Sequence, residues 1–335
     1  KCKVLTVEAG QIYDRYSGGH VSPEAIRAFL HQAFFDDRWR ATVLDSVVFV
    51  GDGTYDPKNL EKKGKNFNLI PPYLHEKIDP WIGETACDRC YGQLDGVDPH
   101  TGDELAGRIF FAEIWTGRFP VNSPQELAAV VSKILAYEKT TPANRIGRSR
   151  VLYLADNYRK AIRNGRVVFD AAGDFVLQAE TARSFNPLAA NSYLAPRIYY
   201  DPLPAFEVYD PDGGEDVPLA RPSDYPWHFP SAAAANSLVR NTISAGVAMV
   251  VYNGHANNFQ QGRTEEAVPN DALVQMNDSF GIANASPTFV QLSMTCLSSQ
   301  FIKPTDSGTV LDEAYFVREG KGSIAAWGPA GLSVV

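Results

Sequence analysis

The sequence predicts a three-layer α/β/α sandwich with a mostly parallel sheet. Short apolar runs rich in β-branched and aromatic residues alternate with amphipathic stretches along most of the chain. Apolar residues make up 44% of the 335 residues, which is enough for a sizeable core. Two of the apolar runs are followed by His255 and Cys296, and in open α/β sheets chemistry collects at the carboxyl ends of the strands.

The first part of the chain is expected to form strands and helices around a long surface segment. Ser22 before Pro23 precedes an amphipathic stretch, an order typical of a helix N-terminus. The segment 57–107 is rich in Pro, Gly, Lys and Asp without periodicity, which indicates surface loops. The expected elements are a strand at 4–7, a polar loop at 14–19, a helix at 22–35, strands at 47–50 and 108–115, and a helix at 123–138.

The second part of the chain continues the alternation, interrupted by a Pro-rich insertion at 201–230. Its strand-like runs are short and apolar, as buried strands are. Alternation with helices favours parallel pairing and helices on both faces of the sheet. The expected strands are 151–154, 198–200, 247–252, 289–294 and 323–327, and the expected helices are 174–183, 231–243 and 309–319.

The charge and hydrophobicity of the chain limit the kinds of binding partner that we expect. The 31 basic and 39 acidic residues give a net charge of −8, and no run of Lys or Arg stands out, which disfavours nucleic acid and anionic membranes. No apolar stretch approaches the roughly 18 residues of a membrane span. The chain begins with Lys1 and no signal peptide, and it starts and stops beside strand-like runs, so we expect a piece of a longer precursor with further domains.

The cysteines and acidic residues leave the metal content open. Cys87 and Cys90 form a Cys-x-x-Cys, but a zinc site needs a second ligand pair, so a local disulfide or two loop thiols is favoured. The acidic loop 210–216 could bind a structural Ca²⁺, yet it lacks the alternating ligand spacing, which favours a solvated loop.

Cys296 and His255 are the candidate catalytic residues. A cysteine after a buried strand is most often a small core residue, and a lone histidine in a Gly-containing turn is usually structural. The polar neighbours of Cys296 indicate a turn that reaches solvent. A thiol and an imidazole at two strand ends are the minimum for a cysteine nucleophile and its base.

The order of these motifs resembles the gingipain family of cysteine peptidases, in the caspase-like clan. That clan places its catalytic His in a turn after one buried strand and its Cys after the next, as in Tyr252-Asn253-Gly254-His255 and Thr295-Cys296. Five further segments are similar in the same order: Tyr13-Asp14 with Ser22-Pro23-Glu24-Ala25-Ile26-Arg27, Val50-Gly51-Asp52, Asp88-Arg89-Cys90-Tyr91-Gly92, Gly117-Arg118-Phe119-Pro120 with Ala136-Tyr137-Glu138, and Gly322 to Trp327.

The resemblance implies a caspase/gingipain-like sandwich in two parts. Residues 1–140 would form an N-terminal α/β subdomain that lacks the family's first strand and helix. Residues 148–335 would form the catalytic caspase-like subdomain, truncated at its C-terminus. No cofactor would be required. The family is usually bacterial and secreted, or found at the cell surface, and acts on polypeptides.

The resemblance also implies roles for individual residues. Cys296 would be the nucleophile of an endopeptidase and His255 its acid and base, and the backbone N–H groups of Cys296 and Ala256 would hold the oxyanion. Asp156 is the nearest match to the acidic residue that orients the His, with a cap or turn residue as the alternative. Ala256 stands where the family has Gly, and a positive φ there would be costly.

Specificity and alternatives stay open at this point. Arg-cleaving members use an Asp in the specificity pocket. Asp174 is the best match and Asp170 the runner-up for cleavage after Arg or Lys, although Asp174 would equally suit a helix N-cap. A secretion-system maturation peptidase or transpeptidase fits the same motifs. A catalytically inactive caspase-like binding domain stays open as an alternative because of Ala256 and the missing ends.

Overall fold

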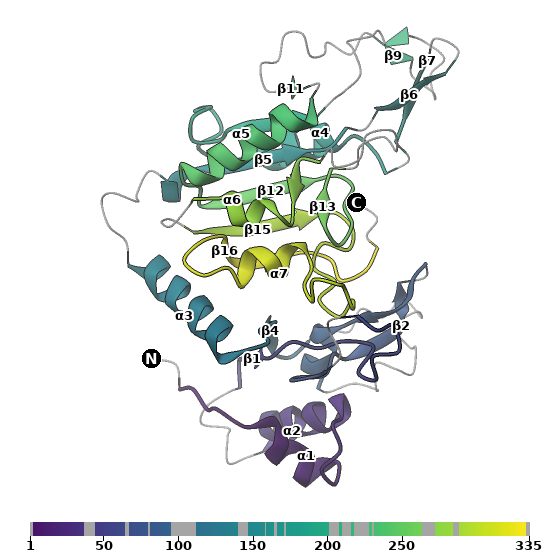
Figure 1. The fold of residues 1–335 in the computed structure, drawn as a ribbon, viewed down its shortest axis with the longest axis vertical. Coiled ribbons are helices and arrows are strands. Elements are labelled where there is room, and N and C mark those ends of the chain that lie inside the picture. The colour runs from purple at the N-terminus through teal and green to yellow at the C-terminus, as the bar shows by residue number, and fades with distance from the viewer. Residues whose placement is uncertain are drawn as a thin grey trace. The chain divides into compact units, whose positions relative to one another are not determined.

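The computed structural model describes most of the chain in two compact units (Figure 1). The first unit comprises residues 1–127 and 300–309, and the second comprises residues 128–299 and 310–335. The described residues are 3–36, 44–63, 67–79, 81–94, 112–139, 147–157, 159–163, 166–170, 172–200, 208–209, 216–217, 228–229, 231–262, 272–283 and 288–332.

The first unit packs two helices and a short helical turn beside two small sheets. Strands β1 (Ser46–Val50) and β4 (Trp115–Phe119) pair in parallel, and β2 (Leu74–Asp79) and β3 (Gly83–Ala86) pair antiparallel. Helices α1 (Ala9–Tyr16) and α2 (Pro23–Phe35) and the 3₁₀ turn η2 (Asp88–Gly92) contribute to the same core. Helix α2 begins as the sequence predicts, because the Ser22 hydroxyl accepts a hydrogen bond from the Ala25 N–H.

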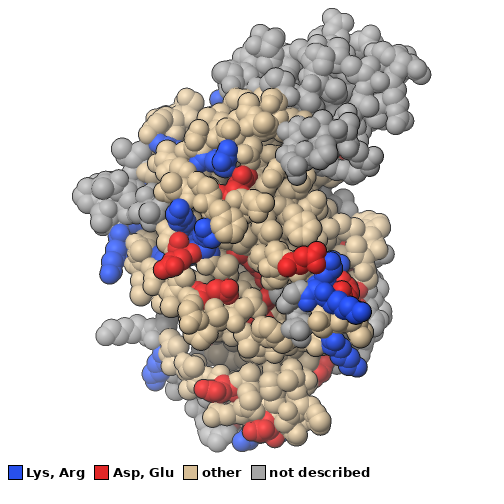
Figure 2. Space-filling model, in the orientation of Figure 1, with Lys and Arg blue, Asp and Glu red and all other residues tan. Residues whose placement is uncertain are grey.

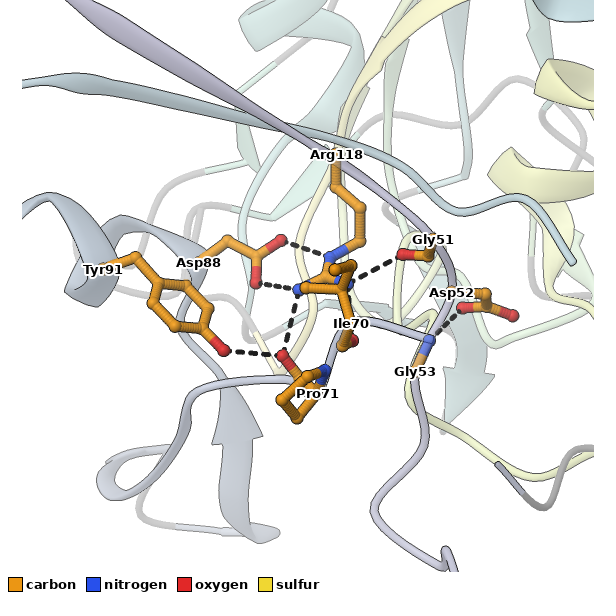
Figure 3. Close-up of polar contacts among 8 residues, drawn as sticks. All are labelled: Gly51, Asp52, Gly53, Ile70, Pro71, Asp88, Tyr91 and Arg118. Carbon is orange, nitrogen blue, oxygen red and sulfur yellow. Dashed lines mark hydrogen bonds and ion pairs between the residues drawn. The ribbon is translucent and has the colours of Figure 1, made fainter. Parts of the chain in front are cut away.

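Arg118 joins three of the family-like segments of this unit (Figure 3). Its guanidinium binds the Asp88 carboxylate through two hydrogen bonds, of 2.7 and 2.8 Å, and donates to the carbonyls of Gly51 and Ile70, both at 2.9 Å. Tyr91 Oη donates to the Pro71 carbonyl at 2.6 Å. The Val-Gly-Asp, Asp-x-x-Tyr-Gly and Gly-Arg segments therefore meet around one buried cation.

The second unit is built on a six-stranded sheet in the order β11-β8-β5-β12-β15-β16, in which every neighbouring pair is parallel. This confirms the predicted α/β class and its parallel sheet. The strands are β5 (Val151–Ala155), β8 (Arg197–Tyr200), β11 (His228–Phe229), β12 (Met249–Asn253), β15 (Phe289–Met294) and β16 (Ser323–Trp327).

Helices cover both faces of this sheet. Leu152 and Leu154 of β5 share a core with α5 (Ala232–Ser244) and α7 (Leu311–Phe316), whereas Tyr153 and Ala155 share one with α4 (Phe175–Ser184). Alternate residues of one strand thus face opposite helical layers, as expected for a buried parallel strand.

The remaining elements are α3 (Pro124–Glu138), η6 (Gly147–Ser149), β6 (Arg159–Arg163), β7 (Arg166–Phe169), β9 (Val208–Tyr209), β10 (Asp216–Val217), β13 (Gln260–Gln261), β14 (Val274–Gln275) and α6 (Asp278–Gly281).

Three local predictions were wrong. Residues 4–7 form no strand: Val4 and Leu5 are 88% and 61% exposed and pair with no strand among the described residues. The loop expected at 14–19 begins inside α1, which extends to Tyr16. Of the strand expected at 108–115, residues 108–111 lie outside the described residues, 112–114 are not in a strand, and β4 runs from Trp115 to Phe119 with Gly117 paired to Val48 inside it rather than ending it.

The surface that is described carries mixed charge. On the face shown in Figure 2, basic side chains lie in small groups near acidic ones, with uncharged residues between the groups. Among the described residues, no helix has the length and apolar composition that crossing a membrane requires. Most of the insertion 201–230 lies outside the described residues.

Candidate active site

The register of the central strands brings the His255 and Cys296 turns to one edge of the sheet. Strand β12 pairs in parallel with β15, and Asn253 lies opposite Met294. His255 and Cys296 each follow two residues after that pair. The Gly254 N–H donates to the Met294 carbonyl at 3.3 Å, which continues the pairing into the turns. The two residues therefore leave neighbouring strands at the same level, as the sequence predicted.

Gly254 and Tyr252 shape the His255 turn. Gly254 has a φ of 151°, and a Cβ at this position would collide with the Asp156 side chain and the Tyr252 phenol, so only glycine fits. The Tyr252 phenol donates to the His255 carbonyl at 2.5 Å and accepts from the Gly262 N–H at 2.7 Å. Burial first, and the charges of Asp156 and Cys296 after it, raise the pKa of Tyr252 well above its usual value, so this phenol stays a neutral donor.

Asp170 contacts the imidazole of His255. Its Oδ2 lies 2.6 Å from His255 Nε2, and its Oδ1 accepts from the Ala172 N–H at 2.8 Å. The carboxylate is only 3% exposed, whereas the His255 side chain keeps 28% exposure. An ionised carboxylate can only accept hydrogen bonds, so with Asp170 ionised this contact selects the tautomer that carries its proton on Nε2.

Asp156 and Asp174 each accept a hydrogen bond from a backbone N–H. Asp156 is buried after β5, and its Oδ2 accepts from the backbone N–H of His255 at 3.4 Å, whereas the ring nitrogen is bound by Asp170. Asp174 is the N-cap of α4, where its side chain accepts from the Leu177 N–H at 2.9 Å. The N-cap alternative therefore describes Asp174, and it is a partly exposed residue rather than a buried carboxylate.

The sequence suggested Asp170 only as a second candidate for a specificity residue, although its position after an apolar run could have indicated a place at the site. The apolar run Val167-Val168-Phe169 precedes it directly, so Asp170 follows a strand end just as Asp156 does. In the structure that run belongs to β7, which pairs antiparallel with β6. This hairpin lies between Asp156 and Asp170 in the sequence, and Asp170 directly after it carries the carboxylate that contacts the imidazole.

The Cys296 turn is held in an unusual backbone conformation. Cys296 is a partly exposed cysteine outside the disulfide. The next residue, Leu297, has a φ of 58°, a region that side chains other than glycine rarely adopt. Its N–H donates to the Gly331 carbonyl at 3.0 Å, and its carbonyl accepts from Asn258 Nδ2 at 3.2 Å. Asn258 thus links the chain after His255 to the chain after Cys296.

Ala256 is compatible with the predicted oxyanion site. It forms an isolated antiparallel bridge with Gln261, flanked by bonds from Gly262 N–H to the His255 carbonyl (2.9 Å) and from Asn257 N–H to the Gln260 carbonyl (3.0 Å). In this pairing pattern the N–H of Ala256 points away from Gln261. Ala256 is not among the described non-glycine residues with positive φ, so the strain expected for Ala at this position does not arise.

The residues that the structure describes include no set of metal ligands. Cys87 and Cys90 form a disulfide with 5.3 Å between their Cα atoms, which agrees with the local disulfide favoured by the sequence. Within the described part of the chain, no group of three His, Cys, Asp or Glu side chains could hold a metal ion. The acidic loop 210–216 lies outside the described residues except for Asp216 in β10.

A parallel sheet with a thiol-bearing and an imidazole-bearing turn on adjacent strand ends defines the class of caspase-like α/β proteins. The chain belongs to peptidase family C25, whose family model matches residues 1–335. The family is one of cysteine-type peptidases, and the predicted resemblance to the gingipains is confirmed. No curated protein sequence matches the chain.

Solved structures of gingipains share this fold. The complex of the pro- and mature domains of RgpB from Porphyromonas gingivalis matches with a TM-score of 0.58 at 16% identity, over 96% of this chain and 57% of that one. The Arg-specific cysteine proteinase gingipain R (RgpB) matches with a TM-score of 0.55 at 16% identity, over 94% and 54%. This chain therefore spans a little over half the length of these structures.

Proposed function

We propose that this protein is a cysteine endopeptidase in which Cys296 is the nucleophile and His255 its acid and base. The shared register of β12 and β15 carries this proposal, because it brings a thiol and an imidazole to the same edge of the sheet. Asp170 supports it, because a carboxylate on Nε2 fixes the tautomer and stabilises the imidazolium that forms during the reaction.

The first half of the proposed reaction forms an acyl-enzyme. The Cys296 thiol gives its proton to His255 Nδ1, and the thiolate attacks the peptide carbonyl carbon. The carbonyl π electrons move to oxygen, and the N–H groups of Ala256 and Cys296 bind the oxyanion. The C–N bond then breaks, His255 protonates the leaving amine, and a thioester remains on Cys296.

The second half is hydrolysis. Water gives a proton to His255 and its oxygen adds to the thioester carbonyl. The C–S bond breaks to release a carboxylic acid, and the thiol is restored. Asp170 keeps its charge throughout, because its role is to hold the imidazole and the imidazolium in one orientation. The cycle needs no cofactor.

We further propose cleavage after Arg or Lys. Asp156 and Asp170 both contact His255, and Asp174 follows Asp170 by four residues at the start of α4. Phe175, which follows Asp174, contacts the His255 ring edge-on with 5.2 Å between the ring centroids, so three carboxylates lie near His255 and favour a cationic substrate side chain. Asp174 is the one we assign to substrate recognition, because it is partly exposed at the start of α4.

An extracellular location is part of the proposal. The disulfide between Cys87 and Cys90 is 5% and 0% exposed, so it is a structural bond and not an accessible redox pair. Structural disulfides are typical of oxidising compartments. A secreted or cell-surface protein acting on polypeptides would fit this chemistry.

Labelling with a peptidyl acyloxymethyl ketone that bears Arg tests the nucleophile. We expect labelling of the wild-type protein at Cys296, seen by peptide mass spectrometry, and its loss in Cys296→Ala. The matched control is Cys2→Ala, which removes the other cysteine outside the disulfide and should leave labelling intact. Labelling that survives Cys296→Ala would rule out the mechanism, and failure of every such probe would favour an inactive binding domain.

Paired carboxylate variants test the two aspartates of this loop. Asp170→Asn should lower kcat by roughly 10³ to 10⁴, because an amide on Nε2 no longer stabilises the imidazolium. Asp174→Asn keeps a capping side chain and should mainly raise KM for Arg substrates relative to uncharged ones. A peptide library cleaved equally well after acidic or bulky apolar residues would overturn the assignment of Asp174.

A further inference from the structure

Asp312 is a fully buried carboxylate beneath the Cys296 turn, and the proposed mechanism does not use it. It is the second residue of α7 and is 3% exposed. Its Oδ1 accepts from Gln291 Nε2 at 2.8 Å and from Ser293 Oγ at 3.4 Å. Its Oδ2 accepts from Ser298 Oγ at 2.9 Å and from Ser299 Oγ.

The four donors flank Cys296 on both sides in the sequence. Gln291 and Ser293 belong to β15, before the turn, and Ser298 and Ser299 follow Cys296 by two and three residues. The Asp312 N–H also donates to the Ser298 carbonyl at 3.1 Å. One side chain therefore joins the strand that enters the turn to the segment that leaves it.

The carboxylate is held by neutral groups. Among the described residues its polar partners are hydroxyls and an amide, and no cation pairs with it. Hydrogen bonds at both oxygens suit a carboxylate that accepts at each of them. Burial raises the pKa of Asp312, and the bonds from Ser299, Ser298 and Ser293 lower it.

The space around this carboxylate is closed. A Cβ added at Gly328 would collide with Ser299 Oγ and Asp312 Oδ2, so the backbone there packs directly on the network. The Ser299 N–H donates to the Pro329 carbonyl at 3.2 Å. Gly328 thus lies directly against the side chains of Ser299 and Asp312, so a change at Asp312 is expected to be passed on to the turn.

The same end of α7 also holds the His255 side of the site. The N–H of Leu311, the residue before Asp312, donates to the Asn258 carbonyl at 2.8 Å. Asn258 in turn donates from Nδ2 to the Leu297 carbonyl at 3.2 Å. Two successive residues of α7 thus bind the chain after His255 and the chain after Cys296.

We propose that Asp312 is a positioning residue of the peptidase: its carboxylate fixes the Cys296 turn and thereby sets the thiol against the His255 imidazole. This inference rests on the proposed function and extends it. Asp312 acts through Ser298, Ser299 and the backbone of the turn and does not touch the substrate. Its removal should weaken the chemical step more than substrate binding.

Asp312→Asn is the main test, and Asp278→Asn is its control. Asp278 is a carboxylate of the same unit that also accepts from an amide, Asn236 Nδ2 at 2.6 Å, and it lies on α6. With an Arg-peptide amide substrate we expect Asp312→Asn to lower kcat on the order of 10- to 100-fold with KM within about threefold. Asp278→Asn should leave both values within about threefold.

A second readout follows the thiol itself. Alkylation of Cys296 by iodoacetamide, measured site by site by mass spectrometry from pH 5 to 9, reports on the environment of the thiol. In Asp312→Asn this profile should shift, because the turn no longer sets the thiol against the imidazole. A purely structural role would lower thermal stability and leave this profile where it is.

The outcomes separate the two proposals. Loss of kcat in Asp312→Asn that Asp278→Asn does not show, together with the shifted alkylation profile, supports the inference. Unchanged kcat and profile in an active, Cys296-dependent enzyme overturns it, while peptidase activity that survives Cys296→Ala overturns the proposed function instead. If Asp312→Asn does not fold, Ser299→Ala removes one donor and should lower kcat about threefold to tenfold. Wild-type kcat in that variant would contradict the inference.

Discussion

Arg118 in the first unit and Asp312 in the second are two buried charges that the protein satisfies in opposite ways. Arg118 has a counterion, Asp88, and three backbone carbonyls around it, and its side chain is 5% exposed. Asp312 is held by a glutamine amide and three serine hydroxyls. The first arrangement neutralises its charge inside the network, and the second surrounds a carboxylate with neutral donors.

The difference shows what each centre is suited to do. An ion pair with bidentate geometry tolerates little movement and joins distant loops, which serves the fold. A hydrogen bond from a neutral donor stabilises a carboxylate less than a cation does. Burying such a carboxylate therefore costs folding free energy, which suggests that it serves a purpose other than stability. In this protein its donors flank the proposed nucleophile. We therefore expect Arg118 variants to lose stability and variants around the two turns to lose activity.

Arg118→Met should have the largest effect. It leaves the Asp88 carboxylate without its partner, and breaking a buried pair from one side costs about 3–5 kcal/mol. Thermal unfolding and limited proteolysis of residues 1–127 would measure the loss. Arg15→Met, at an exposed position of α1, is the control and should change little. An unfolding temperature equal to that of the wild type would break the comparison.

Gly254→Ala should disable the His255 turn with a smaller loss of stability. A φ of 151° and the collision with Asp156 and Tyr252 force the turn to move, and a displacement near 1 Å costs about 10²-fold in rate. The kcat/KM of the purified variant is the measurement. Gly10→Ala, where a Cβ meets nothing within 4 Å, should keep wild-type activity. Full activity in Gly254→Ala would mean that the turn is not rigid.

Lys133 is a third buried ionisable residue, and the dependence of its stability contribution on pH can be compared with those of Arg118 and Asp312. Its Nζ donates to the carbonyls of Tyr315, Phe316, Lys321 and Ser323, and burial lowers its pKa to about 7 from 10.5. Between these pH values the unfolded chain holds a proton that the folded chain has lost, so the free energy of unfolding should rise with pH. Relative to Lys133→Met, the wild type should gain at least about 1 kcal/mol from pH 7 to 10. Parallel stability curves for the two proteins would contradict the lowered pKa.

Tyr252→Phe should have the smallest effect of the set. It removes the phenol oxygen that joins the His255 carbonyl to the Gly262 N–H, at a cost of about 1–3 kcal/mol, and kcat/KM should fall several-fold. Tyr199→Phe is the matched control, because its buried phenol binds Glu180 on the α4 side of the sheet. Equal losses of activity in both variants would assign Tyr252 a general structural role.

Much of the fold could be predicted because its signals are local. Ser22, Ser231 and Asp174 each precede a helix and each accepts from a backbone N–H three residues later. The apolar runs that became β5, β12 and β15 carry their own burial pattern. Residues 4–7 carry the same pattern yet form no strand, because a strand also needs a neighbour to pair with.

The site was harder to predict because its contacts join distant segments. Strand ends identified His255 and Cys296, but the partner of the imidazole depends on a hairpin between Asp156 and Asp170 whose course no periodicity reveals. In the sequence, Asp312 is indistinguishable from an ordinary acidic residue in the first turn of a helix. Its burial and its four donors follow only from the packing of α7 on the segment after Cys296.

The disulfide of the first unit has a consequence for the charge beside it. Cys87 and Cys90 close a covalent ring that contains Asp88, the counterion of Arg118. The oxidation state of two sulfur atoms therefore limits how far the carboxylate can move from the guanidinium. In an oxidising medium the electrostatic centre of the unit is held by a covalent loop, whereas in a reducing medium it would depend on hydrogen bonds alone.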